Sequence, residues 1–430
     1  MARVDGSVAD AACCLLDSFK RPATLLIAVS GGSDSTGLLV ALATLCATGR
    51  YPHITLSACT VDHDLRAGSA EEASGVAAFC ERYGIPHVIR RWDGPKPEAG
   101  VQAAARAKRY ELLVEAAIEA GADAILTAHT REDQTETVAM RAARSPEGIG
   151  LSGMADAVLL KGAVWLLRPF LRIERAAIRN FLIAQGEGWI DDPSNLNPRF
   201  ERVRVRGRGD AVSPAPIAGD RLLLAQRAAD FLGGSVRADR PLFALAPAAV
   251  DTALSDPAAW RGLLLLAATV GGRVHTLEAR SAARLRTFLA SGTLSRLTAG
   301  RVVFDRRRDG LYLYREYRGI APLTLAAGET GTWDGRYRLA NRTARTILVS
   351  AWGDGPMQGP AERLSGPAVR ARRAAPCLKF GDATMVMERG VAIEPEIAPY
   401  AHFLPRFDLP VARALAELVG GRRFASPPNE

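Results

Sequence analysis

Short apolar runs alternate with longer amphipathic segments along the first third of the chain. The runs suit buried strands, and we expect strands at residues 25–29, 54–61, 87–90 and 124–128. Apolar residues at helical spacing fill the segments between them and predict helices at residues 36–47, 70–83, 101–120 and 132–144. This alternation predicts right-handed βαβ units, and therefore an α/β fold with a Rossmann-like parallel sheet. Residues 155–189 predict one further strand–helix pair.

The pattern changes after an arginine-rich stretch and a Pro/Ala/Gly linker at 213–219. Residues 222–291 are rich in alanine, with apolar positions near helical spacing, and predict helices. Apolar runs flank Asp309 and Gly310, a pair typical of hairpin turns. Short β-rich runs follow, and a helix is expected at 410–419. We expect three domains: a catalytic α/β domain at 1–212, a mainly helical domain with a terminal hairpin at 220–320, and a small β-rich α+β domain at 321–430.

Charge and composition point to a polyanionic partner. The 430 residues include 55 Lys and Arg against 46 Asp and Glu, a formal net charge of +9. Only five of the cations are lysines. Arginine suits bidentate contacts with phosphate, so nucleic acid is the first candidate, although genome composition can produce the same excess.

The cysteines and the N-terminal residues exclude other classes. The six cysteines form no CxxC pair, which disfavours a zinc site or an iron–sulfur cluster. Asp5, Asp10 and Asp17 do not suit a signal peptide, and no uncharged apolar run reaches the length of a membrane span. We therefore expect a cytoplasmic protein that does not bind membranes.

A glycine turn joins the first expected strand to the first expected helix. Its glycines let the backbone approach a ligand, and the following helix N-terminus favours anions, so the turn suits a phosphate or pyrophosphate. The Walker A lysine is missing, which makes cleavage of a terminal phosphate less favoured. The alternative is an ordinary turn with Ser and Asp as helix caps. The turn consists of Ser30, Gly31, Gly32, Ser33, Asp34 and Ser35.

Two further polar clusters lie on the predicted α/β framework. Asp62, His63 and Arg66 follow the second strand, where they could hold a ribose, an adenine edge or a metal-bound phosphate, or simply form a polar loop. Arg106 and Arg109 are three residues apart on one helix face. They could bind phosphates or form a solvated face.

Acidic residues begin the helix that follows the fourth strand. Asp133 and Glu136 are three residues apart, so both carboxylates project from one side of its first turns. One could coordinate Mg²⁺ and the other could receive the ammonium group of an amine substrate. The alternative is a helix N-terminus enriched in acids because of the helix dipole. His129, just before this helix, is equally compatible with a structural role.

Taken in order, these motifs resemble those of tRNA(Ile)-lysidine synthetases, which are PP-loop ATP pyrophosphatases. The resemblance covers residues 23–206 and is weaker beyond them. It implies that ATP and Mg²⁺ are used to attach L-lysine to C2 of the wobble cytidine of a CAU-anticodon tRNA(Ile). The tRNA would first be adenylated, with release of pyrophosphate, and AMP would leave when lysine is added. Three positions depart from the family pattern: Thr130 replaces a histidine, Glu132 an aspartate and Val203 an asparagine.

The resemblance also implies roles for particular residues. Catalysis would fall to Asp34, Arg109, Asp133 and Glu136. ATP would be bound by the turn at 30–35 together with Asp62, His63, Arg66 and His129. Mg²⁺ would be held by Asp34 and Asp133. Contacts with the tRNA or with AMP would come from Arg106, Arg199, Arg202 and Arg206.

Other functions remain open at this point. tRNA thiolation by a PP-loop enzyme normally calls for CxxC cysteines, and a glutamine-dependent amidotransferase needs a glutaminase domain that no flanking segment resembles. A non-catalytic RNA-binding protein with a degenerate PP-loop is a further alternative. The sequence leaves the oligomeric state open, a dimer included.

Overall fold

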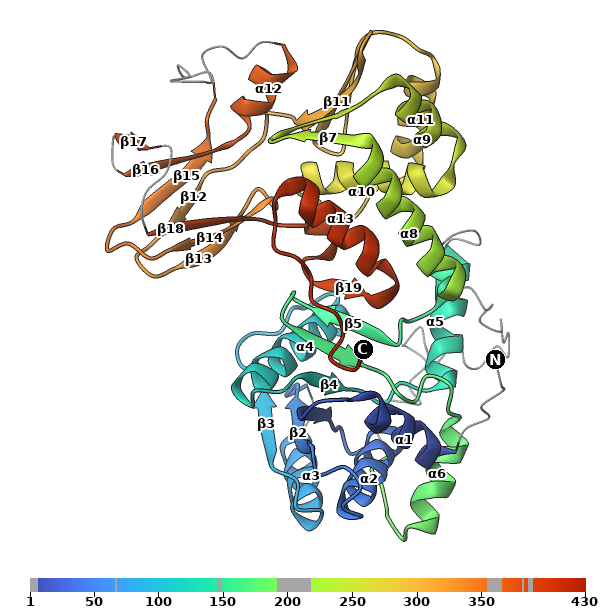
Figure 1. Ribbon diagram of the computed structural model, residues 1–430. Helices are drawn as coiled ribbons and strands as arrows, with labels where there is room; N and C mark the ends of the chain where they lie inside the picture. Colours follow the sequence, from blue (N-terminus) through green and yellow to red (C-terminus); the bar gives the residue numbers. More distant parts are fainter. Residues whose placement is uncertain are drawn as a thin grey trace. The chain divides into compact units, whose positions relative to one another are not determined.

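The computed structural model describes residues 7–65, 68–144, 149–191, 218–353, 366–380, 383–385 and 390–430 (Figure 1). The chain forms two compact units, Met1–Arg221 with Ser426–Glu430, and Leu222–Ala425. In the described part of the chain, no helix has both the length and the apolar character that a membrane span requires.

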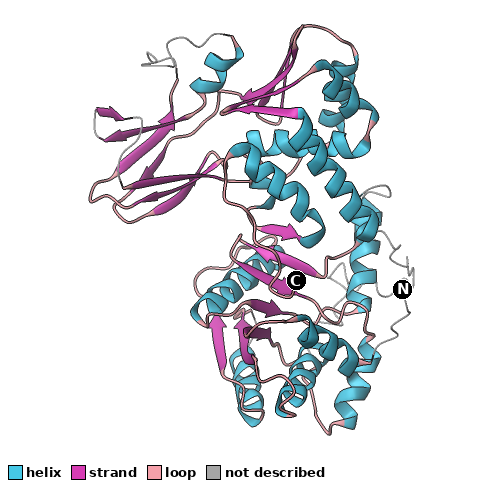
Figure 2. Cartoon of the chain, viewed as in Figure 1, coloured by secondary structure: helices cyan, strands magenta, loops and turns pink. Residues whose placement is uncertain are grey.

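The first unit is built on a mostly parallel sheet (Figure 2). Its strands run in the order β5-β6-β4-β1-β2-β3, and all neighbours are parallel except β5 and β6. Figure 1 shows α4 on one face of the sheet and α2 and α3 on the other. The α/β fold with helices on both faces is therefore confirmed. The strands are β1 Ala23–Ala28, β2 Ile54–Asp62, β3 His87–Arg91, β4 Ala124–Leu126, β5 Ala157–Leu160 and β6 Val164–Leu167.

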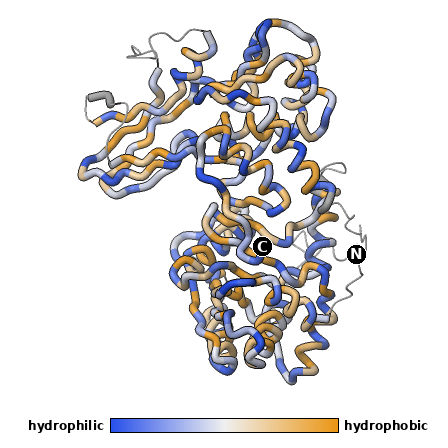
Figure 3. The backbone as a smooth tube through the Cα atoms, in the orientation of Figure 1, coloured by the Kyte–Doolittle hydropathy of each residue, from blue (hydrophilic) through white to orange (hydrophobic). Residues whose placement is uncertain are grey.

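The described helices of the first unit are α1 Val8–Ser18, α2 Ser33–Ala47, α3 Ser69–Arg82, α4 Val101–Glu119, α5 Arg131–Arg144 and α6 Arg175–Ala184. Four of them, α2 to α5, begin and end close to the predicted residues, α6 is the helix expected within residues 155–189, and α1 was not predicted. Continuous apolar runs place β1 at the centre of the core, where Leu25, Leu26 and Ile27 are fully buried. Figure 3 shows hydrophobic segments running through the strands of both units.

One part of the first unit differs from the prediction. Residues 155–189 hold two strands and a helix, because β5 and β6 form an antiparallel hairpin. Lys161 and Gly162 both have positive φ (49° and 65°), as a tight hairpin turn requires. Lysine is not typical of such a turn position, so the sequence does not indicate a turn here and predicts one strand instead of two.

The described residues of the second unit form helices and three small sheets. Its helices are α8 Ala218–Ser235 (which begins in the first unit), α9 Pro247–Ser255, α10 Pro257–Val270, α11 Ala279–Ala290, α12 Pro367–Arg373 and α13 Leu409–Val419. One sheet has the order β7-β8-β11-β10-β9, with strands β7 Val236–Asp239, β8 Leu242–Leu245, β9 Arg296–Ala299, β10 Val302–Arg307 and β11 Gly310–Arg315. The second sheet has the order β12-β15-β16-β17, with β12 Leu323–Leu325, β15 Ile347–Ala351, β16 Pro376–Phe380 and β17 Ala383–Met385. The third has the order β13-β14-β18, with β13 Thr330–Trp333, β14 Tyr337–Asn341 and β18 Val391–Pro395.

The predicted hairpin and final helix are confirmed in this unit, with two corrections. The hairpin loop consists of Arg308 and Asp309, because Arg307 already pairs with Gly310. Gly310 is required there, since a Cβ atom would lie 2.2 Å from the carbonyl oxygen of Leu245. The region expected to be helical also contains β7 and β8, whose four-residue length leaves no periodicity to recognise. A boundary near residue 320 stays a prediction.

Candidate active site

The glycine turn lies at the carboxyl end of β1, between β2 and β4. This is the point where the strand order reverses, the usual ligand position in such sheets. Gly31 has φ of +82°, and a Cβ atom there would lie 2.8 Å from Cδ1 of Ile190. Gly32 precedes α2 without a side-chain hydrogen bond to cap the helix. The first N–H groups of α2 are thus available to an anion.

Two serines brace this turn. The Ser35 hydroxyl donates to the carbonyl oxygen of Gly32 at 3.1 Å and accepts from the backbone N–H of Ser30, also at 3.1 Å. The Ser30 and Ser35 hydroxyls are 3.2 Å apart. Ser33 donates to Asp34 Oδ1 at 3.1 Å. The hydroxyl of Ser35 therefore fixes the shape of the turn, and the carboxylate of Asp34 is held beside it.

Arg175 joins two carboxylates that were predicted to belong to one site. Its Nε donates to Asp34 Oδ2 at 2.9 Å, and its Nη2 lies 3.5 Å from Asp133 Oδ1. Asp34 on α2 and Asp133 on α5 are thus brought together by the first residue of α6. Arg175 was not among the predicted residues. It lies 141 positions from Asp34, and no motif marks it.

The departures at Thr130 and Glu132 have local structural explanations. Thr130 precedes α5, and its backbone N–H donates to Asp133 Oδ2 at 2.9 Å, while the Asp133 N–H approaches the Thr130 hydroxyl at 3.5 Å. This is the reciprocal pattern of a capping box. The Glu132 carboxylate accepts the backbone N–H of Arg175 at 3.1 Å. Glu132 thereby provides a hydrogen-bond acceptor for the first backbone N–H group of α6.

Asp34 and Asp133 are oxygen ligands that a divalent cation could use, and Arg175 contacts both of them. Burial raises the pKa of Asp34, an effect that Arg175 opposes and the nearby charge of Asp133 reinforces. Carboxylate oxygens are the ligands that Mg²⁺ prefers, and it usually takes one or two of them together with phosphate oxygens and water. No group of three or more potential metal ligands was found among the described residues. Asp34 and Asp133 supply two carboxylates next to the glycine turn, which matches the number of protein ligands that Mg²⁺ usually takes when phosphate and water complete its shell.

A second, cationic cluster joins two other predicted motifs. Burial and the charge of Arg109 both lower the pKa of His63. The guanidinium carbons of Arg106 and Arg109 lie 5.2 and 5.4 Å from the ring centroid of Tyr110. Burial would raise the pKa of Tyr110, but Arg109, Arg106 and the buried Arg168 together lower it to about 8. Such a concentration of positive charge suits an anionic ligand.

The remaining predicted residues are less closely tied to these clusters. Asp62 is buried and accepts the backbone N–H of Asp64 at 2.9 Å, so its carboxylate shapes its own loop. The His129 ring lies 3.0 Å from the Thr127 hydroxyl. Glu136 is buried on α5, one turn beyond Asp133. Four predicted site residues lie outside the described part of the chain, as does the departure at Val203: Arg66, Arg199, Arg202 and Arg206.

Comparison with known proteins identifies the family to which the chain is similar. Residues 8–209 match the model of a family described as a PP-loop domain. A protein of Rhizobium meliloti (strain 1021) named tRNA(Ile)-lysidine synthase is 45% identical, with 98% of this chain and 97% of that protein aligned. Proteins of the same name from Mesorhizobium japonicum and Brucella ovis are 39% and 36% identical over 93% of the chain, covering 93% and 95% of their own lengths.

A solved structure, that of the U34-tRNA thiolase NcsA from Methanococcus maripaludis with its [4Fe-4S] cluster, covers 47% of this chain and 71% of its own. It is 18% identical, with a TM-score of 0.39, too low to support a structural argument.

Proposed function

The chain belongs to the tRNA(Ile)-lysidine synthase family, and we propose that the reaction takes place at the glycine turn beside Asp34 and Asp133. The protein is accordingly an ATP-using ligase that forms a carbon–nitrogen bond on a tRNA. Its substrates are ATP, L-lysine and a tRNA(Ile) with the anticodon CAU. Because tRNA and ATP are its substrates, its place of action is the cytoplasm.

In the first step, the C2 oxygen of the cytidine attacks the α-phosphorus of ATP, and pyrophosphate leaves. The N–H groups at the start of α2 bind the pyrophosphate, and the turn braced by Ser35 keeps them aimed at it. Asp34 and Asp133 would hold Mg²⁺, which offsets the charge that builds on the phosphate oxygens. Arg109 binds the α-phosphate or the adjoining tRNA backbone.

In the second step, the neutral ε-amine of lysine attacks C2 of the adenylated base. A C–N bond forms, the bond from C2 to the phosphate-bearing oxygen breaks, and AMP carries that oxygen away as the amine loses a proton. A carboxylate beside the ε-ammonium group binds and orients the lysine before that group loses a proton and attacks as the neutral amine. Glu136 suits this role because it is buried next to the turn of α5 that carries Asp133.

The tRNA must offer its wobble base unstacked, as an anticodon loop permits. Arg106 and the arginine-rich stretch with Arg199, Arg202 and Arg206 bind backbone phosphates of the tRNA. We assign catalysis to residues 1–212 and tRNA binding to the domains at 220–320 and 321–430.

The observation that carries this proposal is the meeting of Asp34 and Asp133 beside an uncapped helix N-terminus. The test is incubation with ATP, labelled lysine and unmodified CAU tRNA(Ile), followed by nuclease digestion. A lysine-bearing nucleoside is expected with lysine and with no other amino acid. A tRNA whose wobble base is not cytidine serves as the matched control. Absence of the nucleoside with active tRNA and ATP would refute the proposal.

A further inference from the structure

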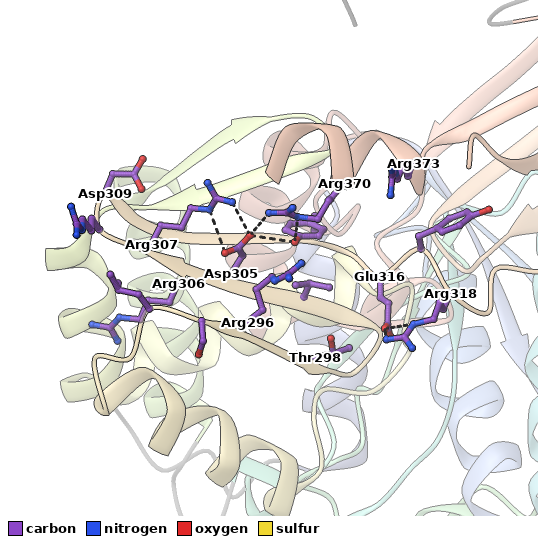
Figure 4. A pocket seen from close by; sticks show the side chains of 16 residues that line it. Arg296, Thr298, Asp305, Arg306, Arg307, Asp309, Glu316, Arg318, Arg370 and Arg373 are labelled. Atoms are coloured by element: carbon purple, nitrogen blue, oxygen red, sulfur yellow. Dashed lines mark hydrogen bonds and ion pairs between the residues drawn. The ribbon is translucent and has the colours of Figure 1, made fainter. Parts of the chain in front are cut away.

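The second unit carries a basic groove that the catalytic site does not use. It has a volume of about 1120 Å³ and lies over β9, β10, β11 and α12 (Figure 4). Seven arginines and three carboxylates line it. The lining includes Arg296, Arg306, Arg307, Arg308, Arg318, Arg370 and Arg373.

A buried carboxylate organises the centre of this groove. Asp305 is 4% exposed and accepts hydrogen bonds from Arg307 Nε at 3.3 Å and Arg370 Nη2 at 3.3 Å. Arg370 Nε also donates to the hydroxyl of Tyr314 at 3.1 Å. Figure 4 shows the Arg307 and Arg370 side chains converging on Asp305 from β10 and α12. Two half-exposed guanidinium groups are thus fixed side by side, although each would be mobile alone.

Two other carboxylates of the lining are already engaged. Glu316 pairs with Arg318 at 2.9 Å, and Asp309 accepts from the Tyr312 hydroxyl at 2.6 Å. The excess of arginines over carboxylates leaves the groove positively charged. Its volume exceeds that of a typical small-molecule pocket, so several anionic groups fit better than one.

We propose that this groove binds consecutive phosphodiesters of the tRNA backbone, with Asp305 as the residue that positions Arg307 and Arg370. The inference rests on the proposed function, which already assigns tRNA binding to these domains, and deepens it by naming the groove and the residues that make the contact. Arginine pairs held by a carboxylate retain N–H donors on their outer edges, which match the geometry of phosphate oxygens. Contacts of this kind give affinity and orientation rather than sequence selection.

The test measures binding of unmodified CAU tRNA(Ile) by fluorescence anisotropy at several salt concentrations, without ATP or lysine. The double variant Arg307→Ala/Arg370→Ala is expected to bind about tenfold more weakly or worse, with a salt slope reduced by about two. The control is Arg280→Ala, an exposed arginine of α11 outside the groove, which should bind like the wild type. Thermal unfolding of each variant verifies that it is folded.

The variant Asp305→Asn distinguishes two effects on tRNA binding, the positioning of Arg307 and Arg370 and the net charge of the groove. It adds one net positive charge, so attraction alone would strengthen tRNA binding, whereas loss of the positioned pair weakens it. We expect weaker binding; tighter binding would overturn the positioning role. Removal of the 5′ phosphate of the tRNA should leave the affinity unchanged, and a loss equal to that of the double variant would overturn the assignment to the backbone.

Wild-type affinity and salt slope in the double variant would overturn the groove proposal and leave the catalytic proposal intact. Failure to form the lysine-bearing nucleoside, with the groove effects present, would refute the catalytic proposal alone.

Discussion

Replacing Arg175 with methionine removes the cation that lies between Asp34 and Asp133. The two carboxylates are 21% and 15% exposed, so water screens them only in part. Removing one partner of a fully buried ion pair lowers the free energy of unfolding by about 3–5 kcal/mol. Because these carboxylates are partly exposed, we expect a loss of about 2 kcal/mol. For a unit of this size, that corresponds to a melting temperature lowered by about 4–8 °C.

The same variant makes a second prediction, about Mg²⁺. Without the guanidinium, the two carboxylates have a greater need for a cation, so Mg²⁺ should stabilise Arg175→Met more than it stabilises the wild type. The assay is differential scanning fluorimetry with and without Mg²⁺. Asp34→Asn in the Arg175→Met background is the matched control, because it removes the repulsion and should recover much of the lost stability.

Two results would refute this reasoning. One is a melting temperature for Arg175→Met equal to that of the wild type. The other is an equal effect of Mg²⁺ on both proteins, which would mean that Asp34 and Asp133 do not form a joint cation site.

Three further predictions concern the other residues of the site. Glu136→Gln should raise the lysine KM by more than about tenfold, because a charge-assisted hydrogen bond to the ammonium is lost; an unchanged KM removes that role. Tyr110→Phe should abolish a phenolate absorbance change with a midpoint near pH 8. The pKa of Tyr110 is lower in the folded protein than in the unfolded chain. The free energy of unfolding of the wild type, compared with that of Tyr110→Phe, should therefore increase between about pH 8 and 10, and this gain should be lost as the pH falls through 8. A difference that does not change with pH would contradict the effect of the three arginines on Tyr110. Gly31→Ala should cost about 1–2 kcal/mol, measured by thermal unfolding, because of its positive φ; unaltered stability would mean that the turn relaxes freely.

The sequence predicts most of the first unit because its patterns are local. The strand β1 is buried on both faces, so its sequence is continuously apolar. The glycine turn before α2 is also a local pattern, because its residues are consecutive in the sequence. The hairpin of β5 and β6 was missed because Lys161 occupies a position that usually takes glycine or asparagine.

The site is harder to predict, because its centre depends on tertiary contacts. Asp34 and Asp133 were recognised from motifs, yet only the fold reveals that Arg175 lies between them. The role of Thr130 as a helix cap likewise required the geometry of α5. The groove around Asp305 depends on the contact between Asp305 of β10 and Arg370 of α12, which are 65 positions apart in the sequence.

We propose that ATP is bound at the glycine turn while pyrophosphate leaves and AMP becomes attached to the tRNA. The direct measurement uses ATP labelled in the α-phosphate and unmodified CAU tRNA(Ile), without lysine, for the wild type and Asp34→Ala. Labelled tRNA and pyrophosphate should form in equal amounts with the wild type and not with Asp34→Ala, which should still bind tRNA. Pyrophosphate release by Asp34→Ala at the wild-type rate would contradict the claim.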